Sequence, residues 1–288
     1  MASRQVPPGR AARRADLTGL AGRTIVITGA SRGIGRAIAL RAARDGANVA
    51  ILAKSAELHP RLPGTIGTTA REVEEAGGTA LPIAVDVRNE DQVEAAIGRT
   101  VETFGGIDVV VNNAGAIRLT GTADTPIRRF DLLMDVNVRA TFLCTQRCLP
   151  HLRRSPNPHV LVLAPPIDLD ARWLAPHLGY TVSKYGMSLC VIGWAEELRP
   201  DGIAVNALWP ATTIATAALR GLGGMVRPEE CRRPEIVADA AHWIVTREGL
   251  EVTGRFLLDE RVLSEAGVTD LEAYAVSPGT ALRADLFL

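Results

Sequence analysis

A glycine-rich turn between a short apolar run and a helical stretch is the feature that most constrains the fold of this chain. The apolar run is Thr24–Ile27, the turn is Thr28-Gly-Ala-Ser-Arg-Gly-Ile-Gly35, and the helical stretch covers residues 36–45. The first glycine of the turn permits a tight bend, the second lets backbone approach a pyrophosphate, and the third lets helix and strand pack closely. The free N–H groups and the positive dipole end of such a helix favour phosphate binding. This arrangement therefore predicts a dinucleotide-binding strand–turn–helix unit.

Seven short apolar runs recur along the chain between longer helical stretches. They occupy residues 24–27, 48–52, 81–85, 107–111, 160–163, 203–208 and 255–258. Continuous apolar runs of this length are typical of parallel strands that helices cover on both faces. We therefore predict an α/β fold with a single doubly wound parallel sheet of about seven strands, the Rossmann arrangement, and a content of 47% hydrophobic residues is ample for its core. We expect residues 18–288 to form this one domain and residues 1–17 to be a flexible N-terminal tail.

Capping signals predict where several of the helices begin and end. Thr69-Ala-Arg-Glu72 has the form of a capping box, and Gly77-Gly78 is expected to end the helix that it starts. Asn89 is expected to cap the next helix, which would stop at Gly105-Gly106. The pair Thr125-Pro126 has the residue types of an N-cap and a first helical turn.

An irregular segment with two prolines and two glycines, residues 55–67, follows the second apolar run. It therefore lies at the carboxyl edge of the predicted sheet, where ligands bind in folds of this kind. Two interpretations remain open for it, a solvent-exposed loop or a flap over the adenosine half of a bound dinucleotide.

Charge and composition argue against several classes of function. The 32 acidic and 32 basic residues balance, so the chain lacks the basic footprint of a nucleic-acid-binding protein. No apolar run approaches the roughly 20 residues that a membrane-spanning helix needs. The four cysteines have neither zinc-site spacing nor a disulfide pattern, so we expect buried free thiols and no metal site. The arginine-rich N-terminus raises the alternative of an organelle transit peptide, but Pro7 and Pro8 argue against an amphipathic targeting helix, and we expect a cytoplasmic protein.

Four motifs, in this order along the chain, resemble those of the short-chain dehydrogenase/reductase family. They are the Gly-x-x-x-Gly-x-Gly turn at 28–35, Asp86 after the third run, Asn112-Asn-Ala-Gly115 after the fourth, and Tyr180-Thr-Val-Ser-Lys184. The resemblance implies the same doubly wound fold, a nicotinamide dinucleotide cofactor, a small-molecule substrate and hydride transfer. Pro165-Pro166, Asn206-Ala-Leu-Trp-Pro210 and the tail 257–288 narrow the resemblance to members with an additional C-terminal sterol-carrier domain, which we expect this chain to lack.

The resemblance assigns cofactor contacts to the glycine-rich turn, to the ends of the following strands and to the Tyr–Lys pair. The expected contacts are Gly29, Ser31, Arg32, Gly33, Ile34, Gly35, Lys54, Asp86, Val87, Asn113, Ala114, Gly115, Tyr180, Lys184 and Pro210. In an enzyme that prefers NAD, a carboxylate at the end of the second strand binds the ribose 2′-hydroxyl. Ala53 occupies that place here, and Lys54 and Arg32 supply cations for a 2′-phosphate. We therefore predict NADP(H) as the cofactor.

Tyr180 and Lys184 are the catalytic pair that the family implies, with Asn137 as a third catalytic residue. A free tyrosine has a pKa near ~10, which is high for proton transfer at neutral pH. Lys184 lies four residues further along the same helix face, so its charge is expected to lower the pKa of Tyr180. Only two of the 32 basic residues are lysines, which favours a specific need for an ammonium group at position 184. The resemblance implies that the lysine also holds the nicotinamide ribose. It also implies that a kinked backbone at Asn137 holds a water on the proton route. From the residues alone, an Asn137 side chain that faces solvent is an equal alternative.

One catalytic residue usual in the family is absent from this sequence. The family usually has a serine about a dozen residues before the tyrosine, but Pro165 stands there and residues 156–179 contain no Ser or Thr. Proline has neither a hydroxyl nor a backbone N–H to donate, and Asp168 or Asp170 could donate only when protonated. Two functions therefore remain open. One is an NADP(H)-dependent oxidoreductase that interconverts a carbonyl and an alcohol on an apolar or lipid-like substrate, and the other is an NADP(H)-binding protein with little or no turnover.

Two further stretches bear on the substrate and on assembly. The segment after Pro210, rich in Ala, Thr and Leu up to Met225, is expected to line the substrate site, with ordinary surface packing as the alternative. The helix predicted from Tyr180 to Leu198 is apolar on more than one face, which predicts a homo-oligomer. The family resemblance implies a homodimer or homotetramer. The family usually assembles through its fourth and fifth helices.

Overall fold

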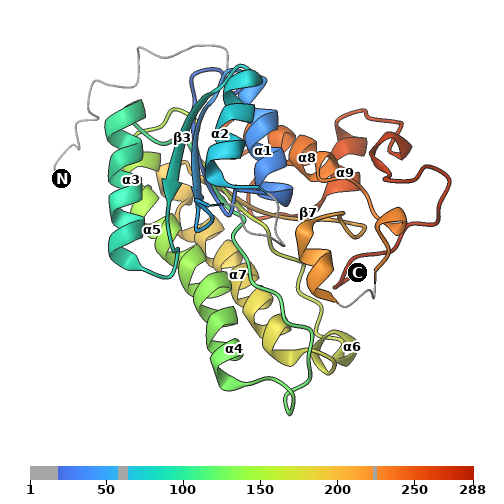
Figure 1. Ribbon diagram of the computed structural model, residues 1–288. Coiled ribbons are helices and arrows are strands. Elements are labelled where there is room, and N and C mark those ends of the chain that lie inside the picture. Colours follow the sequence, from blue (N-terminus) through green and yellow to red (C-terminus); the bar gives the residue numbers. More distant parts are fainter. Residues whose placement is uncertain (1–18, 58–63, 223–225) are drawn as a thin grey trace.

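The computed structural model describes residues 19–57, 64–222 and 226–288. Within these residues the chain forms a sheet of seven parallel strands in the order β3-β2-β1-β4-β5-β6-β7 (Figure 1). The strands are β1 Thr24–Thr28, β2 Asn48–Ala53, β3 Thr79–Ala84, β4 Val109–Asn112, β5 His159–Val162, β6 Ala204–Trp209 and β7 Phe256–Leu258. The doubly wound parallel sheet predicted from the seven apolar runs is confirmed. Because the strand order reverses between β1 and β4, a crevice for ligands opens at the carboxyl ends of these two strands.

Helices cover both faces of the sheet. They are α1 Gly33–Ala43, α2 Ile66–Glu75, α3 Glu90–Phe104, α4 Ile127–Leu133, α5 Ala140–Leu152, α6 Ala171–Leu174, α7 Leu178–Glu197, α8 Glu235–Val245 and α9 Asp259–Glu265. Successive residues of a strand face opposite layers. Ile25 and Ile27 of β1 pack in the layer of α1, α2, α8 and α9, whereas Val26 packs in the layer of α3, α5 and α7 (Figure 1). The five inner strands, β2, β1, β4, β5 and β6, are therefore buried from both sides, which explains why their apolar runs in the sequence are continuous.

Helix α3 begins and ends where the sequence predicts. Asn89 caps it by accepting the backbone N–H of Gln92 at 3.0 Å. The helix stops at Gly105, whose φ of +83° lies in the left-handed region that glycine adopts without a steric penalty.

The capping box predicted at Thr69 is wrong. The box is formed one turn earlier by Thr65 and Thr68, and Thr69 is fully buried inside α2. A residue can cap only where its own backbone is still extended, as it is at Thr65 with φ −130° and ψ 168°. The prediction that Thr125 caps α4 is also wrong, because its hydroxyl donates to the carbonyl oxygen of Gly121 instead.

The cysteines are free, as expected from their spacing. Cys144, Cys148 and Cys231 are fully buried and Cys190 is half-buried. Among the described residues, no group of three or more His, Cys, Asp or Glu side chains is arranged to hold a metal ion. No helix in the same ranges combines the length and the apolar character needed to cross a membrane.

Three expectations fall partly or wholly outside the described residues. These are the tail over residues 1–17, residues 58–63 of the irregular segment, and residues 223–225 of the segment after Pro210.

The C-terminal segment, residues 283–288, folds back onto the chain that follows β6. The backbone N–H of Thr213 donates to the carbonyl oxygen of Arg283 at 2.9 Å, and Thr212 and Ala284 form an antiparallel bridge. The indole N–H of Trp209, at the end of β6, donates to the carbonyl oxygen of Leu286 at 2.9 Å. The C-terminal segment therefore lies at the carboxyl edge of the sheet and belongs to neither helical layer.

Candidate functional site

The turn between β1 and α1 is built so closely that side chains are excluded at two of its glycines. Gly29 has a φ of +70°, and a Cβ added there would come within 2.9 Å of the Cα of Ala114. A Cβ on Gly35 would lie 2.8 Å from the carbonyl oxygen of Gly29 and would collide with the Asn113 amide. The close packing predicted for Gly35 is therefore confirmed, and it holds the turn against the residues that follow β4.

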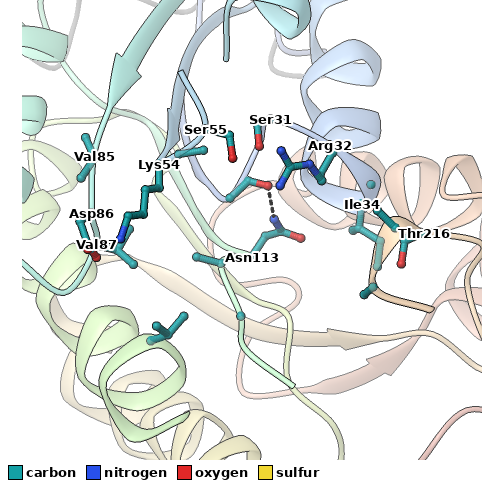
Figure 2. A pocket seen from close by; sticks show the side chains of 18 of the residues that line it. Ser31, Arg32, Ile34, Lys54, Ser55, Val85, Asp86, Val87, Asn113 and Thr216 are labelled. Carbon is teal, nitrogen blue, oxygen red and sulfur yellow. Dashed lines mark hydrogen bonds and ion pairs between the residues drawn. The ribbon is translucent and has the colours of Figure 1, made fainter. Parts of the chain in front are cut away.

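Two polar residues fasten this turn to the segment after β4. The side-chain amide of Asn113 donates to the carbonyl oxygens of Thr28 and Gly29 at 2.8 and 3.1 Å. Figure 2 marks one of these bonds with a dashed line from Asn113. In return, the Thr28 hydroxyl accepts the backbone N–H groups of Asn113 and Ala114 at 3.1 and 3.0 Å. The positioning role of Thr28 was missed by the sequence analysis. A hydroxyl at the last position of a strand was its only signal, and its partners lie more than eighty residues away.

A cavity of about 520 Å³, here called the glycine-loop cavity, opens beside this turn at the carboxyl ends of β1 to β4. Eleven predicted cofactor residues line it: Gly29, Ser31, Arg32, Gly33, Ile34, Lys54, Asp86, Val87, Asn113, Ala114 and Gly115. Residues not predicted also line it: Ala53, Ser55, Val85, Arg88, Leu132, Val136, Thr216, Ala217 and Ala218. The glycine-rich turn and the N-terminus of α1 border this cavity, which fits the pyrophosphate of a dinucleotide.

Charged side chains surround one end of the glycine-loop cavity. Asp86 pairs with Arg88 at 2.6 Å and with the exposed Lys54 at 3.1 Å. Hydrogen bonding to the Arg88 guanidinium holds the pKa of the Asp86 carboxyl well below its usual range. Figure 2 shows Lys54 reaching toward Asp86 across the cavity from Arg32. Arg88 was missed by the sequence analysis, because an arginine two residues after a strand-end aspartate has many other uses.

The irregular segment returns to the glycine-rich turn just before α2. A guanidinium N–H of Arg32 donates to the carbonyl oxygen of Gly64 at 2.8 Å. The fit is close, since a Cβ on Gly64 would lie 2.5 Å from the carbonyl oxygen of Ser31. The described end of the segment thus packs against the glycine-rich turn.

A second cavity, of about 380 Å³, lies on the other side of Asn113 and is here called the tyrosine cavity. Tyr180, Lys184 and Pro210 line it, together with Arg283 to Leu286 of the C-terminal segment. The segment after β6 contributes Thr213, Ile214, Thr216, Ala218 and Leu219. Five residues line both cavities: Ile34, Asn113, Gly115, Thr216 and Ala218. The two cavities are therefore neighbours along one crevice, and the segment after Pro210 lines the second of them as predicted.

Tyr180 and Lys184 are both almost fully buried on α7. The Lys184 ammonium donates to the carbonyl oxygen of Leu163 at 2.6 Å and lies 4.9 Å from the ring centroid of Trp209. Burial lowers the pKa of Lys184 to about 7. The expectation that Lys184 lowers the pKa of Tyr180 is wrong for this structure, because burial raises the pKa of Tyr180 and the charge of Asp285 raises it further.

Asn137 lies in a π-helical stretch, Met134–Arg139, between α4 and α5. Its side-chain oxygen accepts the N–H of Ala116 at 2.7 Å, and its amide donates to the carbonyl of Ala116 and the hydroxyl of Ser183. It is fully buried, so the alternative of a solvent-facing asparagine is wrong. Single π-helical turns are frequent at functional sites, which agrees with the kinked backbone that the family implies.

The diproline where a serine is usual turns away from the tyrosine cavity. Pro165 is buried, and its carbonyl oxygen accepts the hydroxyl of Ser188 at 2.7 Å. Asp168 accepts the N–H of Asp170 and the indole N–H of Trp173, so it serves the start of α6. None of these residues is among the described residues that line the cavity.

The short chain dehydrogenase profile matches residues 23–223. Together with the crevice, the glycine-rich turn and the buried Tyr–Lys pair, this match shows that the chain belongs to the short-chain dehydrogenase family. Hydroxysteroid dehydrogenase-like protein 2 of Danio rerio is 55% identical over 269 residues, which are 93% of this chain and 64% of that protein. The Homo sapiens protein is 52% identical over the same lengths. The narrower resemblance carried by residues 165–166, 206–210 and 257–288 is thereby confirmed, and the chain spans less than two thirds of these relatives.

Solved structures agree with this assignment. A dehydrogenase structure from Xanthomonas campestris is 59% identical with a TM-score of 0.92, covering 94% of this chain and 99% of that one. A metagenomic short-chain oxidoreductase in complex with NADP and a Mycobacterium paratuberculosis short chain dehydrogenase bound to NAD are 26% and 25% identical. Their TM-scores are 0.69 and 0.70, and both cover 83% of this chain, with 97% and 96% of their own chains. A nicotinamide cofactor is therefore common to the fold, and either form of it occurs among the neighbours.

Proposed function

We propose that this protein is an NADP(H)-dependent oxidoreductase that interconverts a carbonyl and an alcohol on an apolar or lipid-like substrate. The observation that carries the proposal is the position of Tyr180 and Lys184 in a cavity that shares five lining residues with the glycine-loop cavity. The remaining lining of the tyrosine cavity is mostly apolar, with Ile117, Leu163 and Trp209 among its side chains. Such a lining suits an apolar substrate held by few polar contacts.

The chain's own residues supply proton transfer and positioning. When bound, NADP(H) supplies or accepts the hydride. Tyr180 passes a proton to the substrate oxygen during reduction, or takes one from it during oxidation, as is usual in the family. Burial raises the pKa of Tyr180, so the phenol carries at neutral pH the proton that reduction of a carbonyl needs, although it is a weaker acid than a free tyrosine. Asn137 holds the backbone of residue 116 at the edge of the cavity.

The preference for NADP(H) is supported by the end of β2. Ala53 closes the strand where an NAD-dependent enzyme would have a carboxylate, and Lys54 follows it. Asp86 is the one carboxylate among the described lining residues of the glycine-loop cavity, and Arg88 and Lys54 neutralise it. A 2′-phosphate would thus meet cations from Lys54 and Arg32 and little repulsion.

Fluorescence titration with NADPH and NADH tests this preference. We expect NADPH to bind at least about tenfold more tightly, which corresponds to roughly 1.4 kcal/mol. Equal affinities, or tighter binding of NADH, would refute the assignment of NADP(H).

A second function, that of an NADP(H)-binding protein with little or no turnover, is favoured by one observation. Pro165 and Pro166 offer no hydroxyl, and removal of one positioned donor commonly reduces rates about 10²–10³-fold. NADPH oxidation with reactive diketones and quinones, for the wild-type protein and Tyr180→Phe, separates the two functions. The reductase predicts turnover that Tyr180→Phe reduces about 10²–10⁴-fold with little change in NADPH affinity. The binding protein predicts NADPH binding without turnover in either.

Assembly through α7 and α5 is a further part of the proposal. Leu189 and Ile192 on α7 are exposed by 60% and 51%, and Phe142 on α5 by 49%, whereas Met187 and Val191 of α7 are fully buried. A helix that is apolar on a core face and on an outer face suits packing against another copy, and we propose a homodimer or homotetramer. Light scattering that reports a stable monomer of 30.7 kDa at micromolar concentration would contradict it.

Domain extent and location complete the proposal. The described residues from 19 onward build a single sheet with its covering helices, which supports one domain over residues 18–288. The cytoplasmic location expected from the sequence is tested by fractionating cells that express the whole chain, and recovery in an organelle would refute it.

A further inference from the structure

The C-terminal segment places an acidic side chain in the tyrosine cavity. Asp285 lines this cavity together with Tyr180 and Lys184 and is the one carboxylate among its described lining residues. Its backbone N–H donates to the carbonyl oxygen of Ala211 at 3.2 Å, and its carboxylate accepts the N–H of Leu286 at 2.8 Å. The side chain is therefore held in place by its own segment and by the chain that follows β6.

Phe287 anchors the segment immediately beyond Asp285. It is 2% exposed, and its ring lies within 5.4 to 6.1 Å of five other aromatic rings, measured between centroids. The five are Trp173, His177, Tyr180, Tyr185 and Trp209. The ring of Phe287 is stacked on that of Tyr180, with an angle of 29° between their planes. Burial of this aromatic residue fixes the C-terminal segment against α7 and so keeps Asp285 in the wall of the cavity that Tyr180 and Lys184 also line.

We propose that Asp285 is a positioning residue of the active site, which acts as the counter-ion of Lys184 and thereby keeps that lysine charged beside Tyr180. The inference rests on the proposed function in treating Tyr180 and Lys184 as the working pair. Lys184 otherwise has only neutral partners in the described structure: the carbonyl of Leu163, the sulfur of Met187 and the ring of Trp209. Burial of an ammonium among neutral groups costs hydration free energy, and a nearby carboxylate offsets that cost.

The electrostatics of the three groups agree with this role. Burial lowers the pKa of Lys184 and the charge of Asp285 raises it again. Partial burial raises the pKa of Asp285 to about 6, while the Lys184 charge lowers it. Burial raises the pKa of Tyr180 and the charge of Asp285 raises it further, so that the phenol keeps its proton. A charged lysine beside a protonated tyrosine is the state needed to donate a proton to a carbonyl, and Asp285 helps to maintain that state.

Other ionisable groups near Asp285 come from several elements. They are Tyr180 and Lys184 on α7, Cys231 after the 3₁₀ turn at 228–230, Arg283 in the same segment, and Asp259 through the backbone of Ala211. The charge of Asp285 contributes to a raised pKa of the Cys231 thiol, so that thiol stays neutral near pH 7. Lys184 is therefore the group whose charge at neutral pH is most sensitive to Asp285.

The composition of the chain makes this inference measurable without turnover. Lys54 and Lys184 are its two lysines, so protein carrying carbon-13-labelled lysine gives two lysine side-chain signals in NMR, assigned with Lys54→Arg. We expect the Lys184 signal to titrate near pH 7 in the wild-type protein. Asp285→Asn should shift this midpoint to lower pH, whereas Asp285→Glu, which retains the charge, should restore it most of the way.

Asp270→Asn is the matched control. Asp270 is another C-terminal aspartate that accepts backbone N–H groups, from Glu272 and Ala273, but it is exposed and remote from α7. Its replacement should leave the Lys184 midpoint unchanged. An unchanged midpoint in Asp285→Asn, an equal shift in Asp270→Asn, or equal shifts in the Asn and Glu variants of position 285 would each overturn the counter-ion role.

The pH profile of NADPH oxidation gives a second reading. Without Asp285, Lys184 loses its proton at lower pH, so the basic limb of the profile for Asp285→Asn should move to lower pH while NADPH still binds. A protein without turnover that shows the NMR shift would refute the reductase and leave the counter-ion intact. Turnover in the wild-type protein, with no shift of the Lys184 NMR midpoint in Asp285→Asn, would refute the counter-ion role and leave the reductase function intact.

Discussion

The two cavities of this protein sit side by side but are built in different ways. The glycine-loop cavity is shaped by backbone: glycines at 29 and 35 leave no room for a side chain, and Thr28 and Asn113 fasten the turn through main-chain atoms. The tyrosine cavity is shaped by side chains from α7, from the chain after β6 and from the C-terminal segment. The first depends on conformations that few residues allow, and the second depends on packing and charge.

This difference separates cofactor binding from substrate chemistry. A change in the backbone-built cavity should affect NADP(H) affinity, whereas a change in the side-chain-built cavity should affect stability, pH dependence and turnover. The two regions meet only along their shared lining, where Ile34, Asn113 and Thr216 border both. Substitutions on either side therefore test whether the separation holds.

The largest effect is expected from Phe287→Ala. Because the ring is 2% exposed among five aromatic rings, its removal should destabilise the protein by about 3–5 kcal/mol. Urea unfolding measures this change. NADPH affinity should fall far less than turnover does.

Leu288→Ala is the control for this substitution, because Leu288 is the next residue but is 36% exposed, so its loss should cost under about 0.5 kcal/mol. A large loss of NADPH affinity in Phe287→Ala at temperatures where it stays folded would break the proposed separation.

The second effect concerns Lys184→Met and the dependence of stability on pH. The unfolded chain holds the Lys184 proton up to about its ordinary pKa of 10.5, but the folded protein only up to about 7. The unfolded state thus binds more protons between these values, and the wild-type stability should rise with pH across that window, on the order of 2–4 kcal/mol. Lys184→Met should lack this rise and be the more stable protein near pH 7, with no turnover.

Thermal unfolding at several pH values between about 7 and 10 measures this difference. Lys54→Met removes the other lysine, which is exposed, and should keep the wild-type rise. If the stabilities of the wild-type protein and Lys184→Met change with pH in parallel, burial of the charged Lys184 does not destabilise the folded protein as proposed.

The third effect is a loss of cofactor binding in Gly35→Ala. The added Cβ would lie 2.8 Å from the Gly29 carbonyl oxygen and against the Asn113 amide, so the turn must shift. Overpacking of this kind costs about 1–3 kcal/mol, and NADPH affinity should fall about tenfold or more.

Gly98→Ala, on α3, provides the comparison for Gly35→Ala. A Cβ there meets nothing within 4 Å, and alanine should stabilise the helix by roughly 0.5–1 kcal/mol with no effect on NADPH. Equal NADPH affinity in both variants would show that the turn tolerates a side chain.

The smallest effect is expected from Lys54→Ala. Its side chain is 72% exposed, so the loss of one screened contact to a 2′-phosphate should weaken NADPH binding only about 3–10-fold and leave NADH binding unchanged. Arg99→Ala removes an exposed cation on α3 and should change neither. If Lys54→Ala weakens NADH as much as NADPH, Lys54 does not recognise the 2′-phosphate.

The same contrast explains what the sequence could and could not reveal. Strands and the glycine-rich turn are local patterns, so their positions follow from runs such as 24–35. The capping threonine of α2 was misplaced by a turn, because Thr65 and Thr69 both precede helical residues and only backbone geometry distinguishes them. Arg88 could be recognised as a site residue only in the structure. There it pairs with Asp86, which also binds Lys54 from the end of β2.

The tyrosine cavity was predicted less completely for a physical reason. Motif spacing places Lys184 beside Tyr180, but the pKa of each depends on burial, and that burial comes from residues such as Phe287 and Trp209. The bond between Trp209 and Leu286 joins residues 77 positions apart, and no periodicity in the sequence indicates it. The roles of Asp285 and Phe287 could therefore be recognised only in three dimensions.

The attachment of the C-terminal segment has a consequence for how such proteins diversify. The segment joins the rest of the chain through an isolated bridge at Thr212 and Ala284, outside the strands of the sheet. Insertions or substitutions in this segment would not shift the register of the strands. Of the segments that line the crevice, it is therefore the one that can vary in sequence, or be exchanged by design, with the least effect on the sheet. An exchange of residues 283, 284 and 286 that keeps Asp285 and the aromatic anchor at 287 would offer a route to altered ligand choice on an unchanged nucleotide-binding scaffold.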